Sequence, residues 1–138
     1  MRRLRVRSRL LVSAFGLVAA LCTAKALHAG VKAASPIYVN TTVPYASGAI
    51  GDARASSDSL QRMQCWANYY NTGSPNMGCN ATDAAGHNLG CWSTNATFVN
   101  AAASLTGDSF VEFYVNASTG ECTYLFVEEA SWASPKQP

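Results

Sequence analysis

The cysteines are the residues of this sequence with the most definite chemistry. Four of them follow the first 30 residues: Cys65, Cys79, Cys91 and Cys122. An even set of cysteines in an exported chain is typical of disulfides, and four cysteines allow three connectivities. A hairpin centred on Thr72 places Cys65 opposite Cys79, whereas one centred on Ala85 places Cys79 opposite Cys91, so symmetry leaves both open. We favour a bond between Cys91 and Cys122, because it closes a longer loop and restricts the unfolded chain more strongly. Cys65 then pairs with Cys79.

Metal binding is the alternative use of these thiols. Their spacings of 14, 12 and 31 residues contain no Cys-x-x-Cys pair of the kind that holds zinc, and an oxidising compartment disfavours free thiolates. The aspartates form no Asp-x-Asp-x-Asp loop with a closing glutamate, so turns and caps explain them better than calcium does. We therefore expect no metal site and no cofactor.

Side chains suited to catalysis are scarce. The exported part of the chain offers one dependable histidine, His87, beside Gly86 in an expected turn, where a structural histidine is usual. No Gly-x-Ser-x-Gly sequence occurs. Glu112 and Glu128, on the last two expected strands, are a carboxylate pair that suits glycoside cleavage, but solvated acids on a strand face are far commoner. We expect no catalytic residue.

Aromatic and amide side chains form the most suggestive binding pattern. They are Trp66, Tyr70, Trp92 and Trp132, with Asn68, Asn71 and Asn76 nearby in sequence. On a flat surface such rings cover the apolar face of a sugar and such amides bond its hydroxyls, although the same rings also form strands and fill cores. The binding hypothesis centres on Trp66 and Tyr70, with Asn71 and Asn76 of the loop that follows.

The orientation of these rings follows from the alternation of residues 60–70. Met63, Cys65 and Ala67 share one face of the expected strand, and Trp66 and Tyr70 share the other. If the first set faces the core, the two rings face outward.

Turn formers and periodicity predict the remaining elements. Asn95 and the two residues before it are suited to capping a helix whose apolar residues recur at helical spacing. The expected elements are strands 60–70, 77–82 and 87–92, a helix at 96–105, and strands 109–116 and 122–127. Residues 51–59 form either a turn or one helical turn, and in a helix Arg54 could pair with Asp58.

These elements predict a small α+β fold. Two successive hairpins, one helix and a final hairpin give an antiparallel sheet with the helix packed on one face, stapled by disulfides. Residues 51–130 form this single domain. Residues 30–50 are an extended leader, either an edge strand or a tether, and residues 131–138 are a polar tail.

The N-terminal segment has the layout of a secretory signal peptide. Five arginines lie within residues 1–9, residues 10–22 are apolar and uncharged, and small residues follow. Residues 1–29 are the expected signal peptide, with cleavage after Ala26 or Ala29. Because a membrane-spanning helix needs roughly 20 apolar residues, we expect no stable membrane anchor after cleavage. The mature chain is expected to be exported, in the periplasm or outside the cell.

Removal of the signal peptide reverses the sign of the net charge. The whole chain carries +2, but the part after residue 29 has four basic and eight acidic residues, a net charge of −4. An anionic domain without a basic cluster is poorly suited to nucleic acid or an anionic membrane. Both partner classes are excluded.

Several short sequences carry a resemblance to other proteins. They are Ala46-Ser47-Gly48-x-x-Gly51-Asp52-Ala53-Arg54-x-Ser56-x-Asp58-Ser59-x-Gln61, Cys79-x-Ala81-x-Asp83-Ala84-Ala85-Gly86, Gly107-Asp108-Ser109-Phe110 and Gly120-x-Cys122-Thr123. Together they resemble small exported proteins of unknown function from Gram-negative bacteria, over about residues 46–135. The resemblance implies secretion and the four-cysteine framework, and it implies no activity.

The functional hypothesis is an exported, non-catalytic binding or interaction module of the bacterial envelope or secreted fraction, with a protein or a glycan as its partner. A structural component of an envelope assembly or appendage is the alternative. A small glycan-active enzyme is the third.

Overall fold

The structure is a computed structural model that describes residues 33–130. The expected signal peptide, the polar tail and Trp132 lie outside the described residues. The elements are β1 (Tyr38–Asn40), β2 (Tyr45–Ala49), α2 (Ile50–Ala55), β3 (Arg62–Asn68), β4 (Asn76–Thr82), β5 (Asn88–Ser93), α3 (Ala96–Ala103), β6 (Phe110–Val115) and β7 (Cys122–Glu128).

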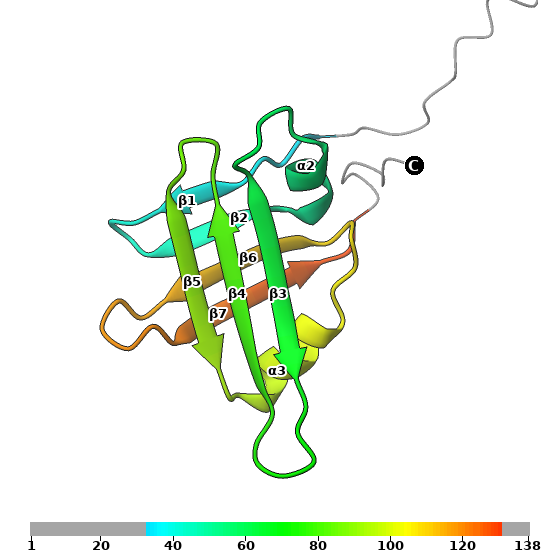
Figure 1. Cartoon of the computed structure of the whole chain (residues 1–138), viewed down its shortest axis with the longest axis vertical. Coiled ribbons are helices and arrows are strands. Elements are labelled where there is room, and N and C mark those ends of the chain that lie inside the picture. The colour runs from blue at the N-terminus through cyan, green and yellow to red at the C-terminus, as the bar shows by residue number, and fades with distance from the viewer. Residues whose placement is uncertain (1–32, 131–138) are drawn as a thin grey trace, which may run out of the picture. The chain divides into compact units, whose positions relative to one another are not determined.

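The strands form two antiparallel sheets. One has the order β1-β2-β6-β7 and the other β3-β4-β5. Figure 1 shows the three-stranded sheet crossing in front of the four-stranded sheet at a steep angle, with α2 at one end of the molecule and α3 at the other. The α+β class is confirmed, but the strands divide into two facing sheets instead of the one sheet expected.

The core lies between the two sheets. Its largest fully buried side chains are Phe113, Met77, Val99, Val111, Cys79 and Ser109. The expected alternation of β3 is confirmed, because Met63 is buried while Arg62, Gln64 and Trp66 are exposed. The three-stranded sheet is the expected meander of two hairpins.

The predicted helix is α3, which ends two residues earlier than expected. The Asn95 side chain caps its N-terminus, with Oδ1 accepting a hydrogen bond of 2.9 Å from the backbone N–H of Thr97. Val99 and Ala102 are buried on its inner side. The helix packs against β3, β4 and β7, and so closes one end of the core.

The expected leader is part of the fold. Residues 38–40 form β1, an edge strand, but residues 45–49 form β2, which lies between β1 and β6. Ala46 pairs with Phe113, and neither side chain is exposed to solvent. The partner strand is more than 60 positions away, and the short β2 contains a glycine, so local patterning could not reveal this pairing. The boundary placed at residue 51 was therefore wrong.

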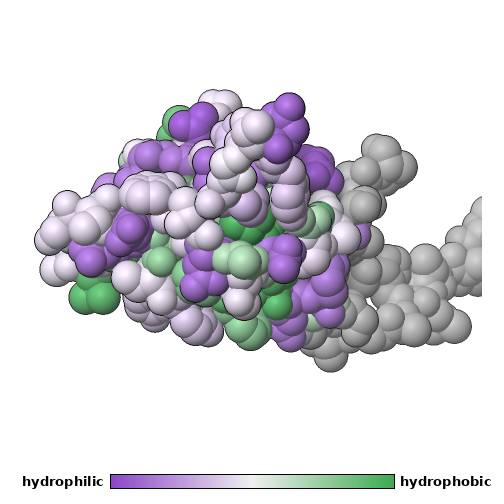
Figure 2. Space-filling view, turned by 90° about the horizontal axis from the view of Figure 1, so that it is seen from below, coloured by the Kyte–Doolittle hydropathy of each residue, from purple (hydrophilic) through white to green (hydrophobic). Residues whose placement is uncertain are grey.

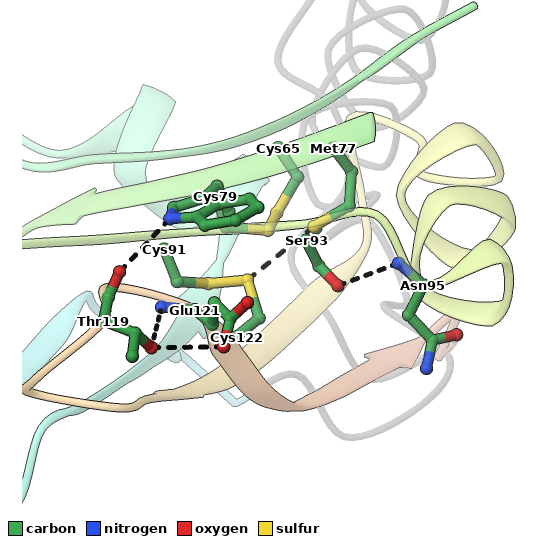
Figure 3. Close-up of a disulfide and its surroundings, with 10 residues drawn as sticks. Cys65, Met77, Cys79, Cys91, Ser93, Asn95, Thr119, Glu121 and Cys122 are labelled. Carbon is green, nitrogen blue, oxygen red and sulfur yellow. Dashed lines mark hydrogen bonds between the residues drawn. A yellow bond between two sulfur atoms is a disulfide. The ribbon is translucent and has the colours of Figure 1, made fainter. Parts of the chain in front are cut away.

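Both predicted disulfides are present. Cys65 bonds to Cys79 within the three-stranded sheet, and Cys91 of β5 bonds to Cys122 of β7, which joins the two sheets. In Figure 3 the second bond lies next to Met77, whose Sδ is 3.7 Å from the Sγ of Cys122. Cys79 also stands directly opposite Cys91 in the sheet, so the register alone permits another pairing.

Residues 51–59, whose state the sequence left open, contain the short helix α2. The ion pair between Arg54 and Asp58 that a longer helix would allow is absent, because α2 ends at Ala55. Asp58 instead accepts hydrogen bonds from the Gln61 side chain at 2.6 Å and from the backbone N–H groups of Gln61 and Leu60. These bonds, the one from the Gln61 side chain foremost, lower the pKa of Asp58 to about 2.

Acid should destabilise the domain through Asp58 and Asp83. Burial raises the pKa of Asp83, but hydrogen bonds from His87 and Ala85 outweigh it, so the pKa lies below its usual value. Both carboxyls thus bind protons more weakly in the folded chain than in the unfolded chain. The stability that these two carboxylates contribute to the fold is fully present above their pKa in the unfolded chain. It is lost as the pH falls from about 4 towards about 2. Urea unfolding across this range should show a falling midpoint.

The variant Asp58→Asn is the control for this effect. It removes one titrating group, so its unfolding midpoint should depend less steeply on pH than that of the unmodified protein. Equal slopes for the two proteins would contradict the assignment to Asp58.

Candidate functional site

The outer face of the three-stranded sheet carries side chains in ordered rows. Directly opposed residues of antiparallel strands point to the same side, so the register defines these rows. From one end to the other they are Arg62, Thr82 and Asn88; Gln64, Asn80 and Gly90; Trp66, Gly78 and Trp92; and Asn68 with Asn76. We call this surface the tryptophan face.

The central row holds two half-exposed indole rings on either side of a glycine. The exposed fractions of Trp66 and Trp92 are 45% and 48%. The Trp66 ring lies over Gly78, because a Cβ on this glycine would fall 2.8 Å from Cε2 of Trp66 and closer still to Cζ2. The glycine therefore allows the ring to lie flat against the sheet.

The second ring is held by the β6–β7 turn. The indole N–H of Trp92 donates to the carbonyl of Thr119 at 3.4 Å, and its backbone N–H donates to the carbonyl of Gly120 at 3.1 Å. Figure 3 shows Thr119 beside the Cys91–Cys122 bond that anchors this turn. The position of Trp92 is therefore fixed from both sheets.

A shallow depression of about 300 Å³ lies between the two rings. Trp66, Trp92 and Asn80 line it, and Gly90 and Gly120 supply backbone without side chains. Two aromatic rings beside a shallow, open depression suit a flat, partly apolar ligand.

Amide groups surround the rings. Asn68 donates to Oδ1 of Asn76 at 3.0 Å, and Asn80 and Asn88 bond each other at 3.2 and 3.3 Å. Each amide has two donor hydrogens and an oxygen with two lone pairs, so Asn68 and Asn80 keep a donor hydrogen for a ligand. The nitrogen of Asn88 is fully used, because it also donates to Ala81 and Thr82. The one charged side chain in the rows is that of Arg62.

The residues of the binding hypothesis lie along one edge of this face. Trp66 is on it, as the alternation predicted, and Asn76 lies in the next row. Tyr70 follows the end of β3, is exposed, and accepts a hydrogen bond of 3.5 Å from the Asn76 amide. Asn71 is exposed in the turn. The structure brings Trp92 to the same row as Trp66, which the hairpin centres at Thr72 and Ala85 together imply, because they place Gly78 opposite both residues.

The other candidates of the sequence lie elsewhere. His87 bonds the Asp83 carboxylate through Nδ1 at 2.8 Å within the β4–β5 turn, so this pair shapes the turn. Glu112 and Glu128 lie on the outer face of the four-stranded sheet, opposite Phe126 and Phe110 respectively. Within residues 33–130, no group of three or more metal-ligating side chains converges.

The sequence did not predict a second aromatic surface, which the structure contains. On the outer face of the four-stranded sheet, neighbouring tyrosine ring centroids are 5.6, 5.1 and 5.5 Å apart in the series Tyr38, Tyr45, Tyr114 and Tyr124. We call this surface the tyrosine face. The alternation of β6 was visible in the sequence, but the row forms only because β1 and β2 join that sheet.

Substitution of Gly78 tests the packing of the Trp66 ring. In Gly78→Ala the new methyl group occupies the space of the indole, so the ring should lift from the sheet and become more exposed. Stability should change by no more than about 1 kcal/mol, since the backbone at Gly78 is ordinary for a strand. Acrylamide quenching of Trp66, with Trp92 and Trp132 replaced by phenylalanine, should increase.

Gly90→Ala is the matched control for this variant. A Cβ at Gly90 meets only Asn80 and a backbone oxygen of Cys79, both at 3.2 Å. Quenching of Trp66 should therefore stay unchanged in Gly90→Ala. An equal increase in both variants would show that the ring does not depend on Gly78.

The end of the molecule that carries α3 has a mostly polar surface. Figure 2 views the molecule from the end that carries α3, and hydrophobic colour is confined there to separate spots. Neither α2 nor α3 has the length and apolar character that crossing a bilayer requires. Comparison with protein families, with curated proteins and with solved structures finds no match for this chain.

Proposed function

We propose that this protein is an exported, non-catalytic binding module that holds a glycan chain on its tryptophan face. The observation that carries the proposal is the central row, in which two half-exposed indoles flank Gly78 above a shallow depression. Sugar rings offer apolar C–H faces that pack against indoles, and their hydroxyls both donate and accept hydrogen bonds.

The amide rows favour a glycan over a protein partner. Exposed asparagines and Gln64 lie on both sides of the tryptophan row, so a polar ligand meets matching groups along the whole face. A protein contact of comparable strength is usually centred on a dry, apolar patch with a polar rim. Here the apolar centre is a single row of two indoles, and amide side chains flank it directly on both sides.

The disulfides support the export part of the proposal. Structural disulfides persist in oxidising compartments and are rare in the cytosol. Both bonds lie within the described domain, and one joins its two sheets. Together with the signal-like N-terminus, they favour a function in the envelope or outside the cell.

Affinity electrophoresis tests the proposal. The mature protein is run in gels that contain dextran, xylan, polygalacturonate or dextran sulfate. We expect at least one polysaccharide to retard the unmodified protein and to have no effect on Trp66→Ala/Trp92→Ala. The control is Tyr124→Ala, which truncates an exposed ring of the tyrosine face and should bind normally. Absence of retardation in all four gels, or loss of binding in the control alone, would refute the proposal.

A further inference from the structure

The few positive charges of the domain lie together. Residues 33–130 contain eight acidic side chains but only two basic ones, Arg54 and Arg62. Both arginines line one depression of about 200 Å³ between α2 and β3. The other lining residues are Ile50, Ala53, Gln61 and Met63.

Neither guanidinium is neutralised by a carboxylate within residues 33–130. The contact between a basic and an acidic side chain that the structure gives there joins His87 to Asp83, and it is an ion pair only when the imidazole is protonated. Asp58, close in sequence to both arginines, is occupied by Gln61 and Leu60. Arg62 donates from Nε to Oγ1 of Thr82 at 3.0 Å, which orients its guanidinium and leaves its terminal nitrogens available.

The apolar surroundings of the two arginines strengthen their interaction with an anion. Ala53 and Met63, which are buried, give the depression an apolar floor, and a charge is less screened beside such a surface than in open water. Guanidinium groups bind carboxylate and sulfate through paired N–H donors. In a domain with excess negative charge, two unpaired arginines at one site are the natural place for an anionic group.

The depression adjoins the tryptophan face. Arg62 and Trp66 are on the same side of β3, four residues apart, which corresponds to about 13 Å along the strand. Gln64 lies between them on that side. A polymer that follows β3 therefore passes over Arg62 as well as the indole, and so reaches the depression that Arg54 also lines.

We infer that Arg54 and Arg62 form a subsite for an anionic substituent of the bound glycan, a carboxylate or a sulfate ester. The inference rests on the proposed function, and it specifies the ligand as an acidic polysaccharide. Trp66 and Trp92 hold the sugar rings, and the arginines select the charge.

Paired polymers that differ only in charge test this subsite. Binding of polygalacturonate is compared with that of its methyl ester, and binding of dextran sulfate with that of dextran. We expect the unmodified protein to bind at least one acidic form about tenfold more tightly than its neutral partner. Added salt should reduce this preference. In Arg54→Gln/Arg62→Gln the two forms of that polymer should bind equally.

A charge-conserving variant controls for folding. Arg54→Lys/Arg62→Lys keeps both charges without the paired donors, so it should retain part of the preference. If the glutamine variant fails to fold, the lysine variant still tests the subsite. Full retention of the preference for the acidic polymer would then exclude recognition through the paired N–H donors of the guanidinium groups.

The outcomes separate the subsite from the proposed function. Equal binding of acidic and neutral forms by the unmodified protein would overturn the subsite and leave glycan binding intact. Binding of an acidic polymer that survives Trp66→Ala/Trp92→Ala but not the loss of the arginines would support the subsite. It would refute glycan binding by the tryptophan face. Binding neither to these four polymers nor to xylan would overturn both.

Discussion

Replacement of Cys91 and Cys122 by alanine is expected to lower the free energy of unfolding by about 4 kcal/mol. The two cysteines are 31 positions apart, and the loop-entropy relation gives about 3.7 kcal/mol for a loop of that length. The bond is also a covalent link between the two sheets, and it lies beside the turn that holds Trp92. Urea unfolding of the double variant measures the loss.

The Cys65–Cys79 bond provides the comparison. Its cysteines are 14 positions apart, and backbone pairing of β3 with β4 already holds them opposite each other. The same relation predicts about 3 kcal/mol for its removal in Cys65→Ala/Cys79→Ala. A larger loss for this pair than for Cys91 and Cys122 would contradict the view that the bond between sheets is the stronger constraint.

Truncation of Trp66 is expected to remove binding and to leave the fold intact. Loss of a central aromatic anchor commonly costs about 2 kcal/mol of binding or more, which corresponds to about 30-fold in affinity. The ring lies on the outer face and is 45% exposed, so Trp66→Ala should unfold at nearly the same temperature as the unmodified protein. Affinity electrophoresis and thermal unfolding give the two measurements.

Phe113→Ala is the reference for the loss of a core ring. Phe113 is fully buried between the sheets, and its truncation should destabilise the domain by roughly 3 to 5 kcal/mol. If Trp66→Ala lost as much stability as Phe113→Ala, Trp66 would be a core residue. Its proposed role in binding on the tryptophan face would then be refuted.

Local patterns explain why the three-stranded sheet was predictable. Its strands follow one another through short turns, and the alternation of Met63 and Cys65 with Trp66 sets which side faces the core. The cap at Asn95 likewise marks the start of α3 within a few residues. Hairpins and caps depend on neighbours in sequence, so the sequence displays them directly.

Distant pairings explain what was missed. Ala46 meets Phe113 across the second sheet, and no local signal in residues 30–50 points to that partner. The tyrosine face depends on the same pairing. That Arg54 and Arg62 line one depression depends on how α2 packs against β3.

The position of Cys79 has a consequence for oxidative maturation. Cys79 faces Cys65 on one side and Cys91 on the other, so an early β4–β5 hairpin can oxidise to a mispaired Cys79–Cys91 bond without any strand leaving its register. The Cys65 thiolate can then attack Cys79 and release Cys91 as a thiolate, and a second oxidation by an added oxidant joins Cys91 to Cys122 once β7 has docked. Maturation of this domain should accordingly be faster with a disulfide isomerase than with an oxidant alone.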